Sequence, residues 1–454
     1  MGYSDKMISI LNKIEIKDSD NIRGNIYLPD DIDGANIFWK SSNPSIISDI
    51  DRVAAKGVVT RGEIDQKVTL VASVSIPENN GCVCNNVELG TKEIDVIVKA
   101  RPPKINDEDY EGYLFGHFIG EETEDSEQIY FSLSESGLNF KDLNNEKPVL
   151  ISNVGEKGVR DPYICRSVEG DRYFLIATDL SIYHRGGWFK NEQGYYDPST
   201  TGSQYLVLWE SIDLINWGEP RLIDVAPVNA GMAWAPEMIY SAETGEYIIF
   251  FASSIMNKET KMKDKPNAIY YVATRDFVHF SDTKIFIDNQ FDEGDVPREI
   301  IDTTVLRIGN YYYSVSKDGD NEEACGGIRI MKTKNLLDPK SWVKVLDIDE
   351  LGLGDIEGKA LDNGLLEGPE LFIINKADRA NKEALEYGII ADQYAIGAGY
   401  LPIVTTDIDD VNNSKGSWKL LKSDEYSFDK LKKRHGTILR VTKEEIDRLK
   451  KAFC

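Results

Sequence analysis

The sequence predicts an all-β protein in which an N-terminal β-sandwich is followed by a five-bladed β-propeller. One repeat places an ionisable side chain before a short, apolar, β-prone run, five times and at intervals of 65 to 76 residues. Its members are Asp161, Glu237, Asp302, Glu367 and His435. A second repeat, out of phase with the first, ends in an aromatic residue after a polar turn, at Phe140, Trp217, Phe280, Trp342 and Trp418. β-runs that recur at such periods are typical of propeller blades of four strands.

The order of the two repeats predicts how the propeller closes. Phe140 precedes the first ionisable position, whereas no aromatic repeat follows His435. Residues 113 to about 145 are therefore expected to supply the outer strands of the last blade, beside the strand that starts at His435. Because the innermost strand of each blade faces the central axis, the five ionisable residues are expected to converge at one mouth of the channel.

The chain divides at a linker. Residues 1–99 contain β-branched runs separated by turns, and the pattern W-x-S-S-N-P from Trp39 to Pro44 resembles reduced bacterial immunoglobulin-like domains that accompany carbohydrate-active enzymes. This stretch is predicted to be an immunoglobulin-like β-sandwich that serves as a packing or spacing module. Residues 100–109 include paired prolines and form the linker, and residues 110–454 form the propeller. The only helix that the sequence predicts is 442–453, at the C-terminus.

Composition narrows the class of partner and the compartment. A net charge of −25 disfavours nucleic acid and anionic membranes as partners. No apolar run approaches the ~18 residues of a membrane helix. The five cysteines do not have the spacing of a disulfide framework or a zinc site. With no signal peptide visible at the N-terminus, the sequence predicts a cytoplasmic protein, and secretion is the alternative.

Carboxylates carried by different blades suit the hydrolysis of glycosides. An inverting glycosidase needs a general base for water and a general acid for the leaving oxygen, about 6.5 to 9.5 Å apart. Four motifs, R-D-P-Y-I at residue 160, W-A-P-E at 234, I-D at 301 and E-G-P at 367, resemble glycoside hydrolase family 43. Members of that family are five-bladed propellers that act on arabinose- and xylose-containing polysaccharides.

The resemblance implies a role for each motif. Asp161 would be the general base, Asp302 the residue that adjusts pKa and orientation, and Glu367 the general acid. The resemblance also implies that no cofactor is required and that His435 lies near the channel axis, where many members hold a water-ligated calcium ion. Two departures leave the substrate open: about fifty residues of propeller precede the Asp-Pro motif, and Glu237 stands where others often have Asp.

Most of the remaining candidates have more than one interpretation. Trp234 is a core residue or a platform for the apolar face of a sugar. Glu237 is expected to hydrogen-bond a sugar hydroxyl, and His435 is a structural, substrate-binding or metal-shell residue. Asp179 contacts substrate or shapes a turn at the end of its strand. The insertion from Tyr183 to Ser203, rich in Gly, Tyr and Trp, is expected to wall a pocket.

The predicted function is an inverting, exo-acting α-L-arabinofuranosidase whose partner is an oligosaccharide or polysaccharide. A β-xylosidase, a galactofuranosidase or an endo-arabinanase of the same family is the alternative within this class. A retaining fructan hydrolase is a rival, but the Asn-Asp-Pro and Glu-Cys strings that it needs are missing at fitting places. A carbohydrate-binding propeller without activity is the non-enzymatic rival.

Overall fold

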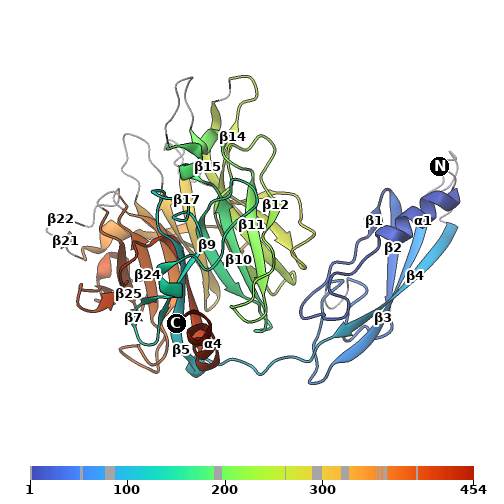
Figure 1. Cartoon of the computed structure of the whole chain (residues 1–454), viewed down its shortest axis with the longest axis horizontal. Coiled ribbons are helices and arrows are strands. Elements are labelled where there is room, and N and C mark those ends of the chain that lie inside the picture. Colours follow the sequence, from blue (N-terminus) through green and yellow to red (C-terminus); the bar gives the residue numbers. More distant parts are fainter. Residues whose placement is uncertain are drawn as a thin grey trace.

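A computed structural model describes two bodies joined by an extended segment (Figure 1). The described residues are 3–51, 55–76, 87–188, 197–260, 262–288, 299–318, 327–353, 355–356, 359–360, 366–394 and 397–454. Of the cysteines, Cys82, Cys84 and Cys325 lie outside these ranges, and Cys165 and Cys454 are free thiols. No helix within the described ranges is long and apolar enough to cross a membrane.

The N-terminal module is an antiparallel sheet of four strands with a helix on one face. Its elements, in chain order, are α1 (Tyr3–Lys13), β1 (Asp31–Ile32), β2 (Ala35–Ser41), β3 (Gln66–Ile76) and β4 (Val87–Val98). Alternation along β2 buries Ile37 and Trp39 and exposes Phe38. The helix was not predicted from the sequence. It forms because Met7, Ile10 and Ile14 recur at helical spacing and enter the same core as the buried face of the sheet.

The propeller has the predicted five blades, each a four-stranded antiparallel sheet. The innermost strands β9, β13, β17, β23 and β28 contact one another around the axis. From the axis outward, blade one consists of β9 (Val159–Arg166), β10 (Tyr173–Asp179), β11 (Tyr205–Ser211) and β12 (Arg221–Asp224), and blade two of β13 (Trp234–Ser241), β14 (Glu246–Met256), β15 (Lys263–Thr274) and β16 (Lys284–Ile287). Blade three consists of β17 (Ile300–Ile308), β18 (Tyr311–Asp318), β19 (Ile328–Thr333) and β20 (Val343–Asp347). Blade four consists of β23 (Glu367–Ile373), β24 (Tyr387–Asp392), β25 (Tyr400–Thr405) and β26 (Trp418–Leu420).

The fifth blade closes the ring as predicted. Its strands, from the axis outward, are β28 (Arg434–Thr442), β5 (Tyr110–Phe118), β6 (Tyr130–Ser134) and β8 (Lys141–Asp142). The two ends of the propeller sequence therefore lie side by side in one sheet, where Thr442 pairs with Tyr110. The inner strand β28, from the end of the propeller sequence, is therefore paired with β5, from its beginning.

Short elements complete the propeller. They are the 3-10 turns η1 (Asp107–Asp109), η2 (Asn144–Glu146), η3 (Ile348–Leu351) and η5 (Val411–Asn413), the helices α2 (Ile182–Arg185), α3 (Pro198–Thr201) and α4 (Lys443–Phe453), and the paired strands β7 (Leu138–Asn139) with β27 (Tyr426–Ser427) and β21 (Asp355–Ile356) with β22 (Lys359–Ala360). Helix α4 is the predicted C-terminal helix. Its N-cap is Thr442, whose side chain accepts a hydrogen bond from the backbone of Glu445.

The repeated aromatic residues explain how the blades adhere. Each of the five belongs to a different apolar cluster of the propeller: Phe140, Trp217, Phe280, Trp342 and Trp418. Burial of large rings stabilises each cluster by the hydrophobic effect. Each of these five apolar clusters thus receives one aromatic residue of the repeat.

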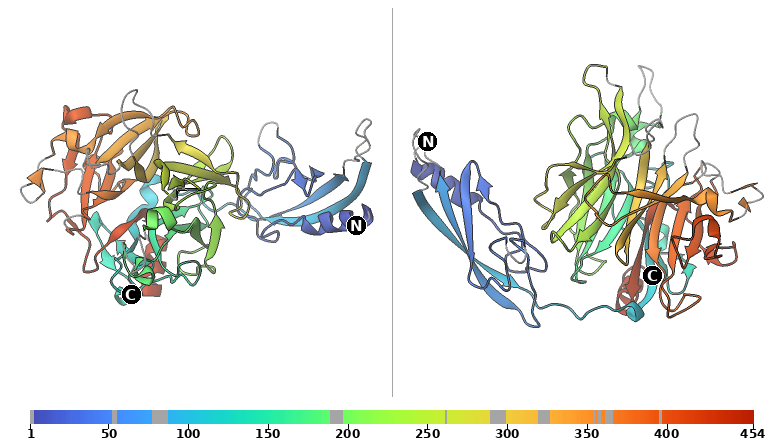
Figure 2. Two further views of the ribbon diagram at one scale, coloured as in Figure 1. Left: turned by 90° about the horizontal axis from the view of Figure 1, so that it is seen from above. Right: turned by 180° about the vertical axis from the view of Figure 1, so that it is seen from behind.

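The N-terminal module lies beside blades one and two (Figure 2). Asp171, in the turn between β9 and β10, accepts hydrogen bonds from Arg61 at 2.7 Å and 2.9 Å and from Arg23 at 2.7 Å. Asn25 donates to the Tyr240 hydroxyl at 3.2 Å. These contacts attach the module to the propeller independently of the linker.

Candidate functional site

Every innermost strand carries a β-bulge near its first residue. In each, two residues stand opposite one residue of the neighbouring strand, and the first of the two is Asp161, Ala235, Asp302, Gly368 or His435. These positions follow one another at intervals of 74, 67, 66 and 67 residues. The first four have backbone φ angles between 46° and 51°, a left-handed conformation that residues other than glycine rarely adopt. The bulge is therefore the structural repeat unit of the channel mouth.

The bulges correct the predicted phase of the ionisable repeat. Asp161, Asp302 and His435 do occupy one position, as predicted. Glu367, by contrast, is the last paired residue before its bulge, and Glu237 is the first paired residue after its own. The sequence intervals hid this difference because a shift of one or two residues is small against a period above 60.

Three of the predicted residues meet at the axis. His435 Nδ1 lies 3.3 Å from Asp161 Oδ1 and 3.9 Å from Asp302 Oδ2. Thr178 of β10 donates a hydrogen bond of 2.8 Å to Asp161 Oδ2, and the backbone N–H of Gly368 donates one of 3.1 Å to Asp302 Oδ2. Four blades, one, three, four and five, thereby contribute to one polar cluster.

Burial and charge set the protonation of this cluster. Burial raises the pKa of Asp302 to about 6, aided by the charges of Glu367 and Asp161 and opposed by His435. For Asp161, burial acts in the same direction but is outweighed by the hydrogen bond and charge of His435, so the pKa is lowered. Burial would lower the pKa of His435, yet the two aspartates and Glu367 raise it to about 9. Near neutral pH the cluster therefore contains an imidazolium ion and an ionised Asp161.

Glu367 sits beside this cluster between two cationic side chains that the sequence analysis did not identify. Arg434 Nη2 donates a hydrogen bond of 2.8 Å to Glu367 Oε1, and Lys317 Nζ lies 3.7 Å from Oε2. Arg434 also donates to Asp392 at 2.5 Å. Arg434 directly precedes His435 in the sequence, so its place next to a singled-out residue was the available signal.

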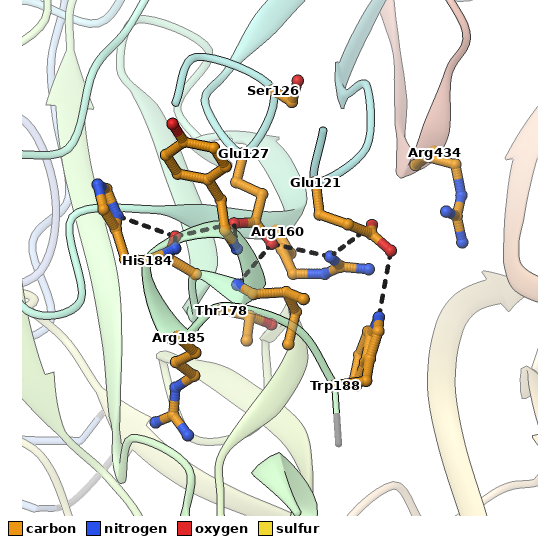
Figure 3. Close-up of polar contacts among 12 residues, drawn as sticks. Glu121, Ser126, Glu127, Arg160, Thr178, His184, Arg185, Trp188 and Arg434 are labelled. Atoms are coloured by element: carbon orange, nitrogen blue, oxygen red, sulfur yellow. Dashed lines mark hydrogen bonds and ion pairs between the residues drawn. The ribbon is translucent and has the colours of Figure 1, made fainter. Parts of the chain in front are cut away.

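The rim beside blade one is aromatic and charged (Figure 3). Glu121, from the connection between β5 and β6, accepts hydrogen bonds of 3.2 Å from Arg160 and of 3.2 Å from the indole of Trp188. The Arg160 guanidinium lies 5.1 Å from the centre of the Trp188 ring, and the Trp188 and Trp234 rings are nearly perpendicular at 6.3 Å. Trp188 belongs to the insertion predicted to wall a pocket, of which 189–196 lies outside the described residues.

Two predicted substrate-binding carboxylates are buried. Asp179 is 2% exposed and accepts hydrogen bonds from the backbone N–H of Glu156 at 2.8 Å and from Ser203 at 2.6 Å, so it fastens two loops at the end of β10. Glu237 is 5% exposed and lies next to Glu370, a residue that the sequence analysis passed over. The structure therefore brings Asp161, Asp302, Glu367 and His435 together and places Asp179 and Glu237 elsewhere.

The side chains at the axis do not fit a metal ion held by His435. Nowhere in the described part of the chain do three or more His, Cys, Asp or Glu side chains gather in a way that could hold a metal. The aspartates beside His435 favour its protonated form, and an imidazolium has no free lone pair to bind a cation.

Comparison with known proteins gives a consistent result. A family profile described as "Probable glycosyl hydrolase domain", related to glycoside hydrolase family 43, matches residues 108–447, and one described as "Atrophied bacterial Ig domain" matches residues 9–101. An α-L-arabinofuranosidase of Bifidobacterium longum subsp. longum is 29% identical over 403 residues, which are 80% of this chain and 35% of that protein. The chain thus spans about a third of the length of this curated relative.

Solved structures similar to part of this chain have low sequence identity. An α-L-arabinofuranosidase from Lactobacillus brevis is 16% identical, with 61% of this chain and 74% of that chain covered and a TM-score of 0.38. An endo-1,4-β-xylanase from Bacteroides thetaiotaomicron is 14% identical, with 68% and 90% covered and a TM-score of 0.41.

Proposed function

The chain belongs to the family of probable glycosyl hydrolase domains related to glycoside hydrolase family 43, and we propose that it is an inverting, exo-acting α-L-arabinofuranosidase. The observation that carries this proposal is the cluster of Asp161, Asp302 and Glu367, presented by three different blades around one imidazolium. The name of the Bifidobacterium relative supports the choice of sugar.

In the proposed reaction Asp161 is the general base. Its lowered pKa keeps it ionised, so it can accept a proton from the water that attacks the anomeric carbon. Glu367 is the general acid and gives its proton to the glycosidic oxygen. Arg434 and Lys317 then stabilise the carboxylate that Glu367 becomes. Asp302 lies beside His435 and the Gly368 backbone and orients the two reacting groups.

Substrate contacts are proposed for the residues that border this cluster. Trp234 flanks the bulge of blade two and is only half-buried, so the accessible part of its ring can pack against the apolar face of a sugar. Trp188 extends this aromatic wall over blade one. A direct contact of Glu237 or Asp179 with substrate stays a prediction, and their burial does not favour it.

The test is hydrolysis of a panel of para-nitrophenyl glycosides by the wild type and Glu367→Gln. We expect release from the α-L-arabinofuranoside by the wild type, with the deficit of the variant larger on a natural oligosaccharide, where the leaving group needs a proton. Release from the β-xyloside or galactofuranoside instead would reassign the sugar. If all aryl glycosides stay intact, linear arabinan distinguishes an endo-arabinanase from a carbohydrate-binding propeller.

The stereochemistry of the first-formed sugar is a separate test. Inversion at the anomeric carbon predicts that proton NMR of a fresh reaction shows the β-anomer of arabinose first. Appearance of the α-anomer would replace the inverting mechanism with a retaining one, in which a carboxylate acts as nucleophile.

The calcium ion implied by the family resemblance is not required for the proposed reaction. Its fit depends on His435, whose nitrogen is directed at two carboxylates. We therefore expect that treatment with EDTA and gel filtration leaves hydrolysis unchanged. Loss of activity that only calcium restores would show that a water-ligated ion belongs to the site.

A further inference from the structure

Below the bulges, the next residue of each innermost strand forms a second ring around the axis. These five residues, the first to pair again after each bulge, are Tyr163, Glu237, Thr304, Glu370 and Thr437. Glu370 accepts hydrogen bonds from two other members of the ring. Its Oε1 accepts hydrogen bonds from the Thr437 hydroxyl at 2.9 Å and the Ile438 backbone at 3.2 Å, and its Oε2 accepts one from the Thr304 hydroxyl at 3.4 Å.

Glu237 reaches Glu370 from across the channel. Their strands, β13 and β23, belong to blades two and four, which are separated by β17 of blade three. Both side chains are buried, at 5% and 4% exposure, and their carboxyl groups are close enough to hydrogen-bond each other. Two ionised carboxylates in such a place would repel each other strongly, so one of them must hold a proton.

The hydrogen bonds indicate which carboxyl holds it. Glu370 accepts three hydrogen bonds, and both of its oxygens have a donor. Glu237 interacts with the Thr304 hydroxyl and the Val305 backbone N–H, but its Oε2 is buried with no donor among the residues that the structure describes. A buried acceptor without a donor is costly, and a proton on Glu237 that is shared with Glu370 removes the cost. Burial and the neighbouring Glu370 also raise the pKa of Glu237 well above its usual value.

The other titratable groups around the pair agree with this assignment. Burial raises the pKa of Tyr163 and Cys165 on β9 and of Tyr400 on β25, so all three stay neutral. His435 on β28 is the charged neighbour, and it favours the ionised form of Glu370. Burial nevertheless raises the pKa of Glu370 to about 7.

We propose that Glu237 and Glu370 share one proton across the channel axis and that Glu370 is a positioning residue for hydrolysis. Glu370 binds β28 at Thr437 and Ile438, two and three residues beyond His435. It thereby fixes the strand that brings His435 to Asp161 and Arg434 to Glu367. Glu237 acts through Glu370 and not on the sugar. The kinetic part of this inference rests on the proposed function.

The pair has a defined pH dependence. A carboxyl whose pKa is raised in the folded state contributes stability that is fully present below its unfolded-state pKa and is lost as the pH rises through the folded-state pKa. In Glu237→Gln the amide still donates to Glu370 but does not titrate. We expect the Tm of the wild type to fall more than that of Glu237→Gln between about pH 4.5, where an unfolded glutamate titrates, and about pH 7.

Kinetics give a second readout on the same variants. Glu237→Gln is expected to keep KM and to gain in kcat relative to the wild type as the pH rises, whereas Glu237→Leu, which has no donor, loses kcat by about tenfold or more at all pH values. Glu370→Gln keeps an acceptor for Thr437 and Ile438 and should also flatten the Tm profile.

The two readouts separate the possible failures. Identical Tm profiles of wild type and both Gln variants would overturn the shared proton, whatever the activity. A raised KM in Glu237→Gln would overturn the positioning role and return Glu237 to the substrate. A flattened Tm profile in a protein without glycosidase activity would support the shared proton while rejecting the proposed function.

Discussion

At the scale of single residues, the three proposed catalytic carboxylates have separate roles that variants can distinguish. Asp161→Asn, Asp302→Asn and Glu367→Gln should each lower kcat/KM by about 10²- to 10⁴-fold, because each removes a proton-transfer or orienting group. Each replacement preserves side-chain volume, so the variants should keep the fold, which circular dichroism checks, although the Tm can fall because each change removes a charge from a buried ion pair. Wild-type turnover by either Asp161→Asn or Glu367→Gln would be incompatible with the assignment.

We expect His435 to set the acid limb of the pH dependence of kcat/KM. Its hydrogen bond and positive charge are the largest effects that lower the pKa of Asp161 against burial, ahead of those of Arg160 and Thr178. In His435→Gln that charge is gone, so the pKa of Asp161 should rise, and the acid limb of kcat/KM should move to higher pH. The control is Arg160→Lys, which keeps the charge of the other cation near Asp161. An unmoved acid limb in His435→Gln would remove Asp161 as the group that titrates there.

At the scale of elements, the bulge of β23 needs glycine. Gly368 has a φ of +51°, and an added Cβ would lie 2.6 Å from Cγ of His435. Gly368→Ala should therefore lose ~1 to 2 kcal/mol of unfolding free energy from backbone strain and ~1 to 3 kcal/mol from overpacking, and activity with it. Gly309→Ala is the matched control, with a φ of +60° and nothing within 4 Å of its Cβ, and should lose only the first contribution in urea unfolding.

Helix α4 is a second element with a testable contact. The buried Glu445 accepts hydrogen bonds from Arg166 at 2.8 Å and also from the Tyr173 hydroxyl, and so fastens the end of the chain to blade one. Glu445→Ala leaves Arg166 buried without its partner and should cost about 3 to 5 kcal/mol in denaturant unfolding. The adjacent, exposed Glu444→Ala should cost less than ~0.5 kcal/mol. Equal losses of unfolding free energy in the two variants would mean that the ion pair with Arg166 does not attach α4 to blade one.

The elements also show what sequence reasoning could reach. The number of blades and the closure through β5 could be predicted from the order of two repeats. One repeat marks the innermost strand of every blade, and the other marks an aromatic residue of every apolar cluster. The phase error at Glu237 and Glu367 arose because a bulge shifts the pairing by one residue without changing the composition of the strand. Lys317 was missed because a cation inside a strand has no pattern of its own, whereas Arg434 had a signal in its place directly before His435. Helix α1 had a readable signal in Met7, Ile10 and Ile14.

At the scale of the whole molecule, Asp171 forms two of the ion pairs that dock the N-terminal module. Asp171→Ala removes the acceptor for both Arg61 and Arg23. We expect a larger radius of gyration in small-angle scattering and faster proteolysis between residues 99 and 106, with hydrolysis of an aryl glycoside unchanged. Asp282→Ala, which removes an exposed carboxylate from blade two, is the control and should change none of these. An unchanged scattering profile in Asp171→Ala would mean that other contacts suffice.

The closure of the ring in blade five also decides how the protein bears mechanical load. The linker enters at Tyr110, which pairs with Thr442 just before α4, so the N-terminal module and the C-terminus pull on the same corner of the sheet. Tension between them would open β5 from β28 one residue pair at a time, which resists force less than sliding the strands along each other. Asp107 lies at that corner and accepts hydrogen bonds from Arg379 at 2.8 Å and Arg440 at 2.6 Å. Asp107 therefore acts as a latch: while its ion pairs hold, tension on the linker cannot open β5 from β28.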